Sequence, residues 1–211
     1  MIDMKRLFSI LPMLVLAFNL LNAADLRTIF INMPDSVMPL FTKSERMDFF
    51  DYMDSGMDAK ATNKLGGESV MTLFRDDMLS INTSESGRAD IVLFKRKDGT
   101  SLICMIVTVL GNYPDSRLSF YNEDWTPVPA NSLIKYPSME DYLTKKALKN
   151  DSLPELQRQS MLRLQSVSAV DGVLEFNYTS LGYIGEDAKY FRDWFKDEPI
   201  RFFWNGKRFK R

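Results

Sequence analysis

Residues 89–110, which read ADIVLFKRKDGTSLICMIVTVL, decide the fold of this 211-residue chain. Two largely apolar runs, 89–95 and 102–110, flank the polar stretch Lys97-Asp98-Gly99-Thr100. An Asp-Gly pair tolerates the positive φ angles of a type I′ turn, so the stretch predicts a β-hairpin. The second run is apolar on both faces, which is typical of a central strand that is covered on each side. We expect a helix to cover one of those sides.

Further hairpins are predicted on either side of this central pair. Short runs with a period near two, bounded by turn residues, indicate strands. The predicted pairs are 70–74 with 78–81 around Asp76-Asp77, 161–169 with 173–179 around Asp171-Gly172, and 200–204 with 207–210 around Asn205-Gly206, and residues 117–121 add an edge strand.

Helix signals occur in three segments. Thr42-Lys43-Ser44-Glu45 is a capping box, and apolar residues follow it at helical spacing, so residues 34–57 predict a helix preceded by a short turn at 35–41. Residues 138–148 and 186–195 predict the second and third helices. In the last of these, Phe191 and Trp194 should pack over Phe202 and Trp204 of the closing hairpin.

The order of these elements predicts an α+β fold, mainly an antiparallel sheet of hairpins packed with two or three helices. We expect residues 24–211 to form a single domain, in which residues 54–67 are a polar connector and residues 122–137 a long loop. An alternative is two diverged helix-plus-sheet halves with a sub-boundary near residues 122–138.

The first 23 residues predict a cleavable signal peptide. Lys5 and Arg6 precede the apolar segment 7–21, and Asn22-Ala23-Ala24 supplies small residues for cleavage. As a helix the apolar segment reaches about 22 Å, short of the ~30 Å hydrocarbon core, which disfavours a membrane anchor. No later stretch approaches the length of a membrane span, so we expect no transmembrane segment after cleavage.

Composition excludes several classes of function. The formal net charge is −1, so no broad basic field points to nucleic acid. The chain has no His and 1 Cys, which removes His-dependent nucleophiles, a cysteine zinc cluster and an internal disulfide. The lone Cys104 lies in the most apolar run and is expected to be inert packing, and no Cys near the cleavage site offers a lipoprotein anchor. Phosphate-binding glycine loops are also missing, so no cofactor is predicted.

Carboxylates leave two further hypotheses open. Asp48, Asp51, Asp54 and Asp58 follow one another around the end of the first helix, where a Ca²⁺ site is conceivable. Their spacing does not match an EF-hand, and a solvated charged face explains them better. A pair of carboxylates is able to hydrolyse glycosides without His, but no pair stands out here. The sequence therefore predicts no catalytic, cofactor-binding or metal-binding residue.

Aromatic side chains supply the candidate binding surface. They crowd the C-terminal part of the chain, where Phe203 should point away from the face that Phe202 and Trp204 share. We select Trp125, Phe203 and Trp204 as candidates for contact with a partner. Lys207, Arg208, Lys210 and Arg211 beside them are interpreted as guards of a terminal edge strand.

Two short motifs are similar to sites of O-glycan attachment. Asp35-Ser36-Val37 and Asp151-Ser152-Leu153 resemble the Asp-Ser/Thr-aliphatic acceptor sites of exported proteins from some Gram-negative gut bacteria. Ser36 and Ser152 are therefore candidate acceptors, with helix capping as the structural alternative.

A set of short segments in the first part of the chain carries a resemblance: residues 33–43, 46–48 and 52–55, followed by Ala61-Thr62-Asn63-Lys64-Leu65 and Ser69-Val70-Met71-Thr72. On these residues the chain resembles a family of exported Bacteroidales proteins that has no assigned function, and the resemblance covers essentially the whole mature chain. The closing stretch 203–209 is similar to the last hairpin of many small periplasmic proteins of such bacteria. The resemblance implies a place in the periplasm or outer envelope of a Gram-negative bacterium, and it implies no catalytic residue.

Together these patterns predict an exported binding or accessory module of the cell envelope, without enzymatic activity, that contacts an envelope protein or a glycan. The alternative is a His-independent hydrolase that uses paired carboxylates, as glycosidases do.

Overall fold

A computed structural model describes residues 25–153 and 164–211 of the chain. The predicted signal peptide and the beginning of the predicted strand 161–169 lie outside these residues. Helices and strands follow in the order α1 (Leu26–Ile31), α2 (Lys43–Asp54), β1 (Lys60–Thr62), β2 (Glu68–Phe74), β3 (Met78–Ser84), β4 (Gly87–Lys95), β5 (Ser101–Val109), β6 (Asp115–Tyr121), β7 (Pro127–Val128), α3 (Ala130–Leu133), α4 (Met139–Tyr142), η1 (Ala147–Lys149), β8 (Gln165–Val170), β9 (Val173–Tyr178), η2 (Ser180–Asp187), α6 (Ala188–Phe191), η3 (Arg192–Trp194), β10 (Ile200–Trp204) and β11 (Phe209–Lys210).

The strands form two antiparallel sheets. The first sheet has seven strands in the order β1-β2-β3-β4-β5-β6-β7, and the second has four in the order β11-β10-β9-β8. Every neighbouring pair within the sheets is antiparallel, which confirms the predicted α+β class built from hairpins. β4 and β5 lie in the middle of the first sheet, with Lys95 opposite Ser101 and Gly87 opposite Val109.

The two Asp-Gly turns differ in geometry, and the expected type I′ turn is found at the second of them. At the β4–β5 hairpin only Gly99 has a positive φ, and the loop closes by a bond from the Arg96 amide to the Thr100 carbonyl, so the predicted type I′ turn is wrong there. At the β8–β9 hairpin both Asp171 and Gly172 have positive φ, which is the type I′ geometry. Because the β4–β5 loop is longer, Asp98 does not adopt a positive φ.

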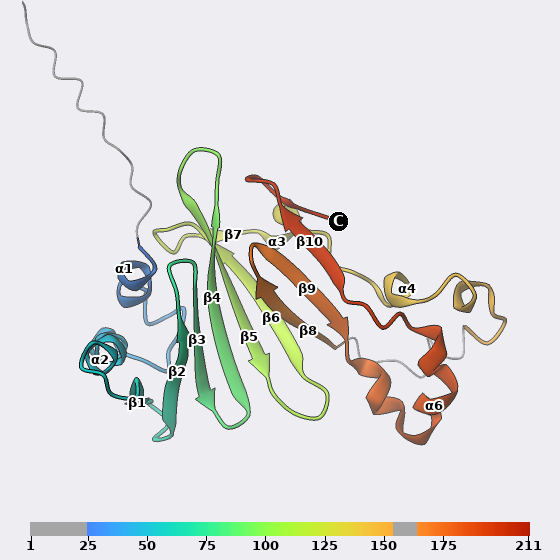
Figure 1. Cartoon of the computed structure of the whole chain (residues 1–211), viewed down its shortest axis with the longest axis horizontal. Coiled ribbons are helices and arrows are strands. Elements are labelled where there is room, and N and C mark those ends of the chain that lie inside the picture. Colours follow the sequence, from blue (N-terminus) through green and yellow to red (C-terminus); the bar gives the residue numbers. More distant parts are fainter. Residues whose placement is uncertain (1–24, 154–163) are drawn as a thin grey trace, which may run out of the picture.

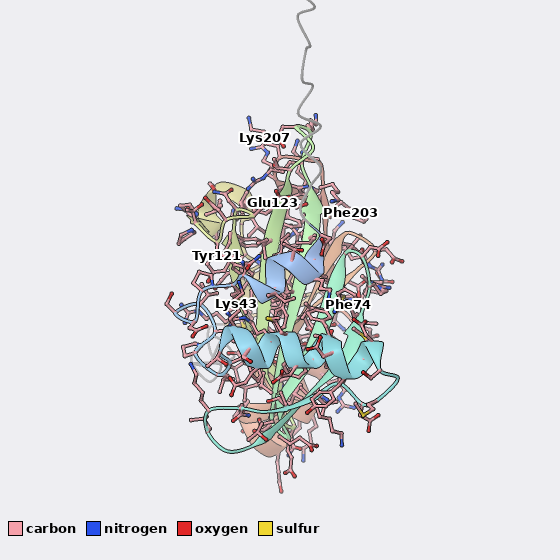
Figure 2. All side chains as sticks on the ribbon, turned by 90° about the vertical axis from the view of Figure 1, so that its left-hand side faces the viewer. Lys43, Phe74, Tyr121, Glu123, Phe203 and Lys207 are labelled. Atoms are coloured by element: carbon pink, nitrogen blue, oxygen red, sulfur yellow. The ribbon has the colours of Figure 1, made fainter. Side chains whose placement is uncertain are left out.

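The first sheet is covered on both faces, as predicted for β5. Figure 1 shows helices α1 and α2 on one side of this sheet and the second sheet on the other. Figure 2 shows α2 lying across the strands. Because alternate strand residues face opposite ways, Ile103 and Met105 pack against the helices, whereas Leu102, Cys104 and Ile106 pack against the second sheet.

The helical segments differ most from the sequence predictions. α2 has the predicted capping box, in which Thr42 accepts from the Glu45 amide and Glu45 accepts from the Thr42 amide. The preceding α1 was not predicted, and the connector 54–67 contains strand β1. Strand β6 is flanked by β7, so it is not the edge strand that the sequence suggested.

The predicted helices 138–148 and 186–195 are each broken into short turns. Their chains pair with each other instead, because the Thr144 amide donates to the Trp194 carbonyl and the Lys196 amide donates to the Tyr142 carbonyl, both at 2.8 Å. An isolated bridge between Leu143 and Phe195 lies within this pairing. Backbone groups committed across the two segments cannot continue a helix.

The aromatic packing predicted for the C-terminus is also corrected. Phe202 and Trp204 pack in the core between the sheets, where Trp204 meets Phe94 and Phe209 with ring centroids 5.9 Å and 4.8 Å away. Phe191 and Trp194 belong to a separate small cluster around Leu143.

Candidate binding surface

The outer face of the second sheet presents an apolar row that crosses all four strands. The register places Phe203 opposite both Lys210 and Val173, and Val173 opposite Val170. Strand alternation turns these side chains away from the core, so Phe203 is 53% and Val170 50% exposed, while Phe202 beside them is buried. We call Lys210, Phe203, Val173 and Val170 the outer row.

A neutral pair lies next to the outer row. Arg201 and Glu175 face each other across β10 and β9, and Arg201 Nε donates to Glu175 Oε1 at 2.7 Å. This hydrogen bond and the negative charge of Glu175 raise the pKa of Arg201. The pair satisfies its own charges, so among the described residues of this face the apolar row is the feature left to contact a partner.

Of the three predicted surface aromatics, only Phe203 lies on this face. Trp204 is half-buried, and its Nε1 donates to the Lys95 carbonyl at 2.6 Å. Trp125 is buried in the core beneath α1, where its Nε1 donates to the Ile29 carbonyl at 3.0 Å. Trp125 also holds a positive φ of 64°, which is rare for a bulky residue. The structure therefore brings none of these three side chains together.

The candidate glycan acceptors are both exposed to solvent. Ser36 lies in the turn between α1 and α2, next to Asp35, which pairs with Arg46 and Lys64. Ser152 follows η1, and its amide donates to Asn150 Oδ1. The described helices next to Ser36 are capped by Asp25 and Thr42, so Ser36 is not their cap, whereas the helix that begins at Leu153, after Ser152, continues outside the described residues. The modification of both serines stays a prediction.

A groove that the sequence did not single out lies between α2 and β1. It encloses about 620 Å³ and is lined by Glu45, Asp48, Tyr52, Met57, Asp58, Lys60, Ala61, Thr62 and Glu68. Its signal in the sequence was the spacing of Glu45, Asp48 and Tyr52, which share a helix face at i, i+3 and i+7. The β1 strand that forms its other wall was hidden in the polar connector.

Two titratable side chains in the core, Asp90 and Cys104, are buried in the packing between the sheets. Burial raises the pKa of Asp90, whose Oδ2 accepts from Arg88 Nε at 3.1 Å and whose Oδ1 has no hydrogen-bond partner. Asp90 shares the strand face of Val92, so it points toward the second sheet and away from the α2–β1 groove. Burial likewise raises the pKa of the Cys104 thiol.

Residues 25–153 and 164–211 contain no group of three or more acidic or thiol side chains placed to hold a metal ion. In the acidic series around the end of α2, Asp54 pairs with Arg27 at 2.6 Å and Asp58 lies 3.8 Å from Lys60. No helix within these ranges is long and apolar enough to cross a bilayer.

Comparisons with known proteins agree on the fold and leave the activity open. No curated protein sequence matches this chain significantly. A solved structure described as a domain of an uncharacterized protein from Porphyromonas gingivalis W83 is 26% identical, covers 88% of this chain and 98% of its own, and superimposes with a TM-score of 0.78. A family model described as a protein of unknown function, DUF3256, matches residues 18–209. The predicted resemblance to a Bacteroidales family without an assigned function is thereby confirmed, and the chain belongs to the DUF3256 family.

Proposed function

We propose that this chain is an exported protein of the cell envelope that acts as a binding module without catalytic activity. Its partner is another envelope protein, held on the outer row of the second sheet. The observation that carries the proposal is the exposure of Phe203, at 53%, in line with Val170 at 50%. Aromatic side chains in an apolar surface patch are the groups that most often dominate binding energy at protein interfaces.

The shape and chemistry of the outer row favour a protein partner over a glycan. Sugar sites combine an aromatic platform with polar groups that converge on the hydroxyls. Here the neighbours of Phe203 along the row are Val173 and Lys210, and the adjacent Arg201 and Glu175 already satisfy each other. A flat apolar row with a charged end suits the core and rim of a protein interface.

Export is supported by the sequence of residues 1–23 and is tested separately. Expression of the full chain in a Bacteroidales host, followed by N-terminal sequencing of the protein from the periplasmic fraction, should give Ala24 as the first residue. An intact N-terminus in the cytoplasmic fraction would contradict the assignment to the envelope.

Site-specific photocrosslinking tests the binding surface. A photoreactive phenylalanine replaces Phe203 in one strain and Val109, which is 65% exposed on the first sheet, in a matched control strain. We expect a discrete crosslinked protein at position 203 that is missing at position 109. The same products at both positions, or none at 203, would overturn the proposal. A product whose added mass resists proteases and yields to glycosidases would replace the protein partner by a glycan.

A further inference from the structure

The groove between α2 and β1 has the layout of a site for an added β-strand. One wall is the helix face of Glu45, Asp48 and Tyr52, and the other is the edge strand β1. Several families of peptide-binding domains use this arrangement, in which an extended peptide pairs with an exposed sheet edge and its side chains enter a neighbouring groove.

The backbone of β1 turns unused hydrogen-bonding groups toward this groove edge. On its inner side, the Ala59 carbonyl accepts from the Met71 amide and the Asn63 amide donates to the Gly67 carbonyl, both at 2.9 Å. In an antiparallel pair the residues alternate between bonding inward and bonding outward. Lys60 and Thr62 therefore direct their N–H and C=O groups away from β2. β1 is the first strand of its sheet, so no strand in the described parts of the chain pairs with that edge.

The net charge of the α2–β1 groove indicates the kind of segment that it binds. Four of its lining residues are acidic and one is basic, which gives a net charge of 1 − 4 = −3. The single cation, Lys60, lies 3.8 Å from Asp58 and 3.4 Å from Glu68, so it offsets part of that charge. Met57 and Tyr52 add apolar surface, since they are 55% and 41% exposed.

We infer that the groove binds an extended basic peptide segment of another protein as an additional strand on β1. Successive side chains of a strand point to opposite faces, so every second residue of the peptide faces α2. Lys or Arg at these alternate positions would meet Asp48 and Glu45, and apolar residues between them would cover Met57. A second copy of this chain is the wrong occupant, because it would bring a second groove of charge −3 to the same edge.

This surface is separate from the outer row, so the inference goes beyond the proposed function. The edge of β1 is three residues long and offers the backbone groups of two outward-facing residues. So short a pairing supplies little affinity alone, and electrostatic attraction must supply the rest. The binding should therefore weaken steeply as salt increases.

The test uses the full mature chain and a fluorescent peptide of about eight residues with alternating Lys and Val. A Glu-Val peptide of the same length is the reference ligand. Binding is measured by fluorescence anisotropy at low salt, and hydrogen exchange of the backbone amides is measured with and without the peptide. We expect saturable binding of the Lys-Val peptide alone, and slower exchange at the amides of Lys60 and Thr62.

Three variants separate strand addition from unspecific attraction. Asp48→Lys reverses a charge inside the groove, and Asp51→Lys makes the same change on the exposed part of α2 outside it. We expect Asp48→Lys to weaken binding about tenfold and Asp51→Lys less than about threefold. Thr62→Pro removes an outward N–H at an edge where proline is tolerated, so it should weaken binding while the melting temperature stays unchanged.

Several results would overturn the inference. These are equal losses in the two charge variants, unchanged exchange at Lys60 and Thr62, or no saturation up to about 1 mM peptide. Slow exchange at these amides in a dimer without peptide would identify a second copy as the occupant and would contradict the charge argument. Failure here leaves the crosslinking at position 203 untouched, so the two proposals fail independently.

Discussion

The two faces of the first sheet bury polar side chains in opposite ways. On the helix side, Arg46 is 1% exposed and donates to the carbonyls of Phe41, Met33 and Ile31, while Asp35 lies 3.0 Å from its Nη1. On the side of the second sheet, Asp90 is 2% exposed, and one of its carboxylate oxygens has no partner.

The difference shows what a buried charge is used for in each place. Arg46 donates to the carbonyl of the last residue of α1 and to two carbonyls of the segment that joins α1 to α2. That segment has little regular structure to satisfy its own backbone. Asp90 lies within a complete strand ladder, where the backbone needs no such help. We therefore expect the removal of Arg46 to destabilise the fold and the removal of the Asp90 charge to stabilise it.

Replacement of Arg46 should have the largest effect. Arg46→Met keeps the length of the side chain but leaves three carbonyls, two of them in buried hydrogen bonds, without their donor, and it removes one of the two cations beside Asp35. We expect a loss of about 3–5 kcal/mol in the free energy of unfolding, measured by urea denaturation.

Arg27→Met is the matched control, because Arg27 pairs with Asp54 in a side-chain pair that is 39% and 55% exposed. Its loss should cost less than about 1 kcal/mol. Equal losses in the two variants would contradict the anchoring role of Arg46.

Neighbouring residues of β10 test the two faces of the second sheet. Phe202 is 4% exposed and packs against Phe176, whereas Phe203 is 53% exposed. Phe202→Leu should cost about 1–2 kcal/mol of stability, and Phe203→Leu should stay within about 0.5 kcal/mol. Thermal denaturation followed by circular dichroism measures both, and a costly Phe203→Leu would mean that this side chain supports the fold.

Asp90→Asn should change how stability depends on pH. Burial holds the pKa of Asp90 above its ordinary value of 3.8, so the native state resists ionisation that the unfolded state undergoes. The wild-type chain therefore loses stability from this group as the pH rises from 3.8 to the raised pKa. The advantage of Asp90→Asn should grow over that range, by about 1.4 kcal/mol per unit of pKa shift, and then level off.

Asp98→Asn should behave in the opposite way in the same series of urea titrations. Hydrogen bonds from Thr100 lower the pKa of Asp98, so its contribution is present above 3.8 and is lost as the pH falls through the lowered value. The deficit of Asp98→Asn should accordingly shrink on acidification. If the stability gained by Asp90→Asn does not change with pH, the Asp90 carboxyl has the same pKa in the native and unfolded states, which would contradict the prediction.

The smallest effect compares the two capping boxes. Thr42 begins a helix of 12 residues and accepts from the Glu45 amide through its side chain. Ser138 begins a helix of four, and there Asp141 accepts from the Ser138 amide while the Ser138 side chain makes no cap hydrogen bond. Thr42→Ala should lower the free energy of unfolding by about 1 kcal/mol, and Ser138→Ala should lower it by a few tenths of a kcal/mol, because fewer residues depend on the second cap. Amide hydrogen exchange in the two first turns measures this, and equal costs would show that the cap matters independently of helix length.

The same pair of boxes shows how far the sequence predicts the fold. After Thr42, apolar residues recur so that Phe49 and Phe50 face the first sheet, and burial extends the helix. After Ser138, the backbone at Tyr142 and Thr144 pairs with a segment some fifty positions later, which local pattern cannot reveal. Hairpins were predictable because their turns and partners are adjacent in the chain.

The candidate binding residues likewise divide into those whose position follows from local sequence and those whose position depends on distant contacts. The outward direction of Phe203 follows from strand alternation and was predictable from Phe202 and Trp204 beside it. Trp125 stands in a polar stretch, Glu123-Asp124-Trp125-Thr126, and nothing local signals that its ring reaches α1, so its burial is not predictable from the sequence. The α2–β1 groove required a strand whose three residues lack any apolar alternation.

The two tryptophan ring nitrogens also impose an order on folding. Trp125 binds a carbonyl 96 positions earlier in the chain, and Trp204 binds one 109 positions earlier. A chain that emerges with its N-terminus first must hold α1 without its anchor until the β6–β7 turn has appeared. The Lys95 carbonyl at the end of β4 likewise lacks its hydrogen bond from Trp204 until the final hairpin is complete. Loss of the last dozen residues should therefore loosen a strand in the middle of the first sheet and slow folding from its start.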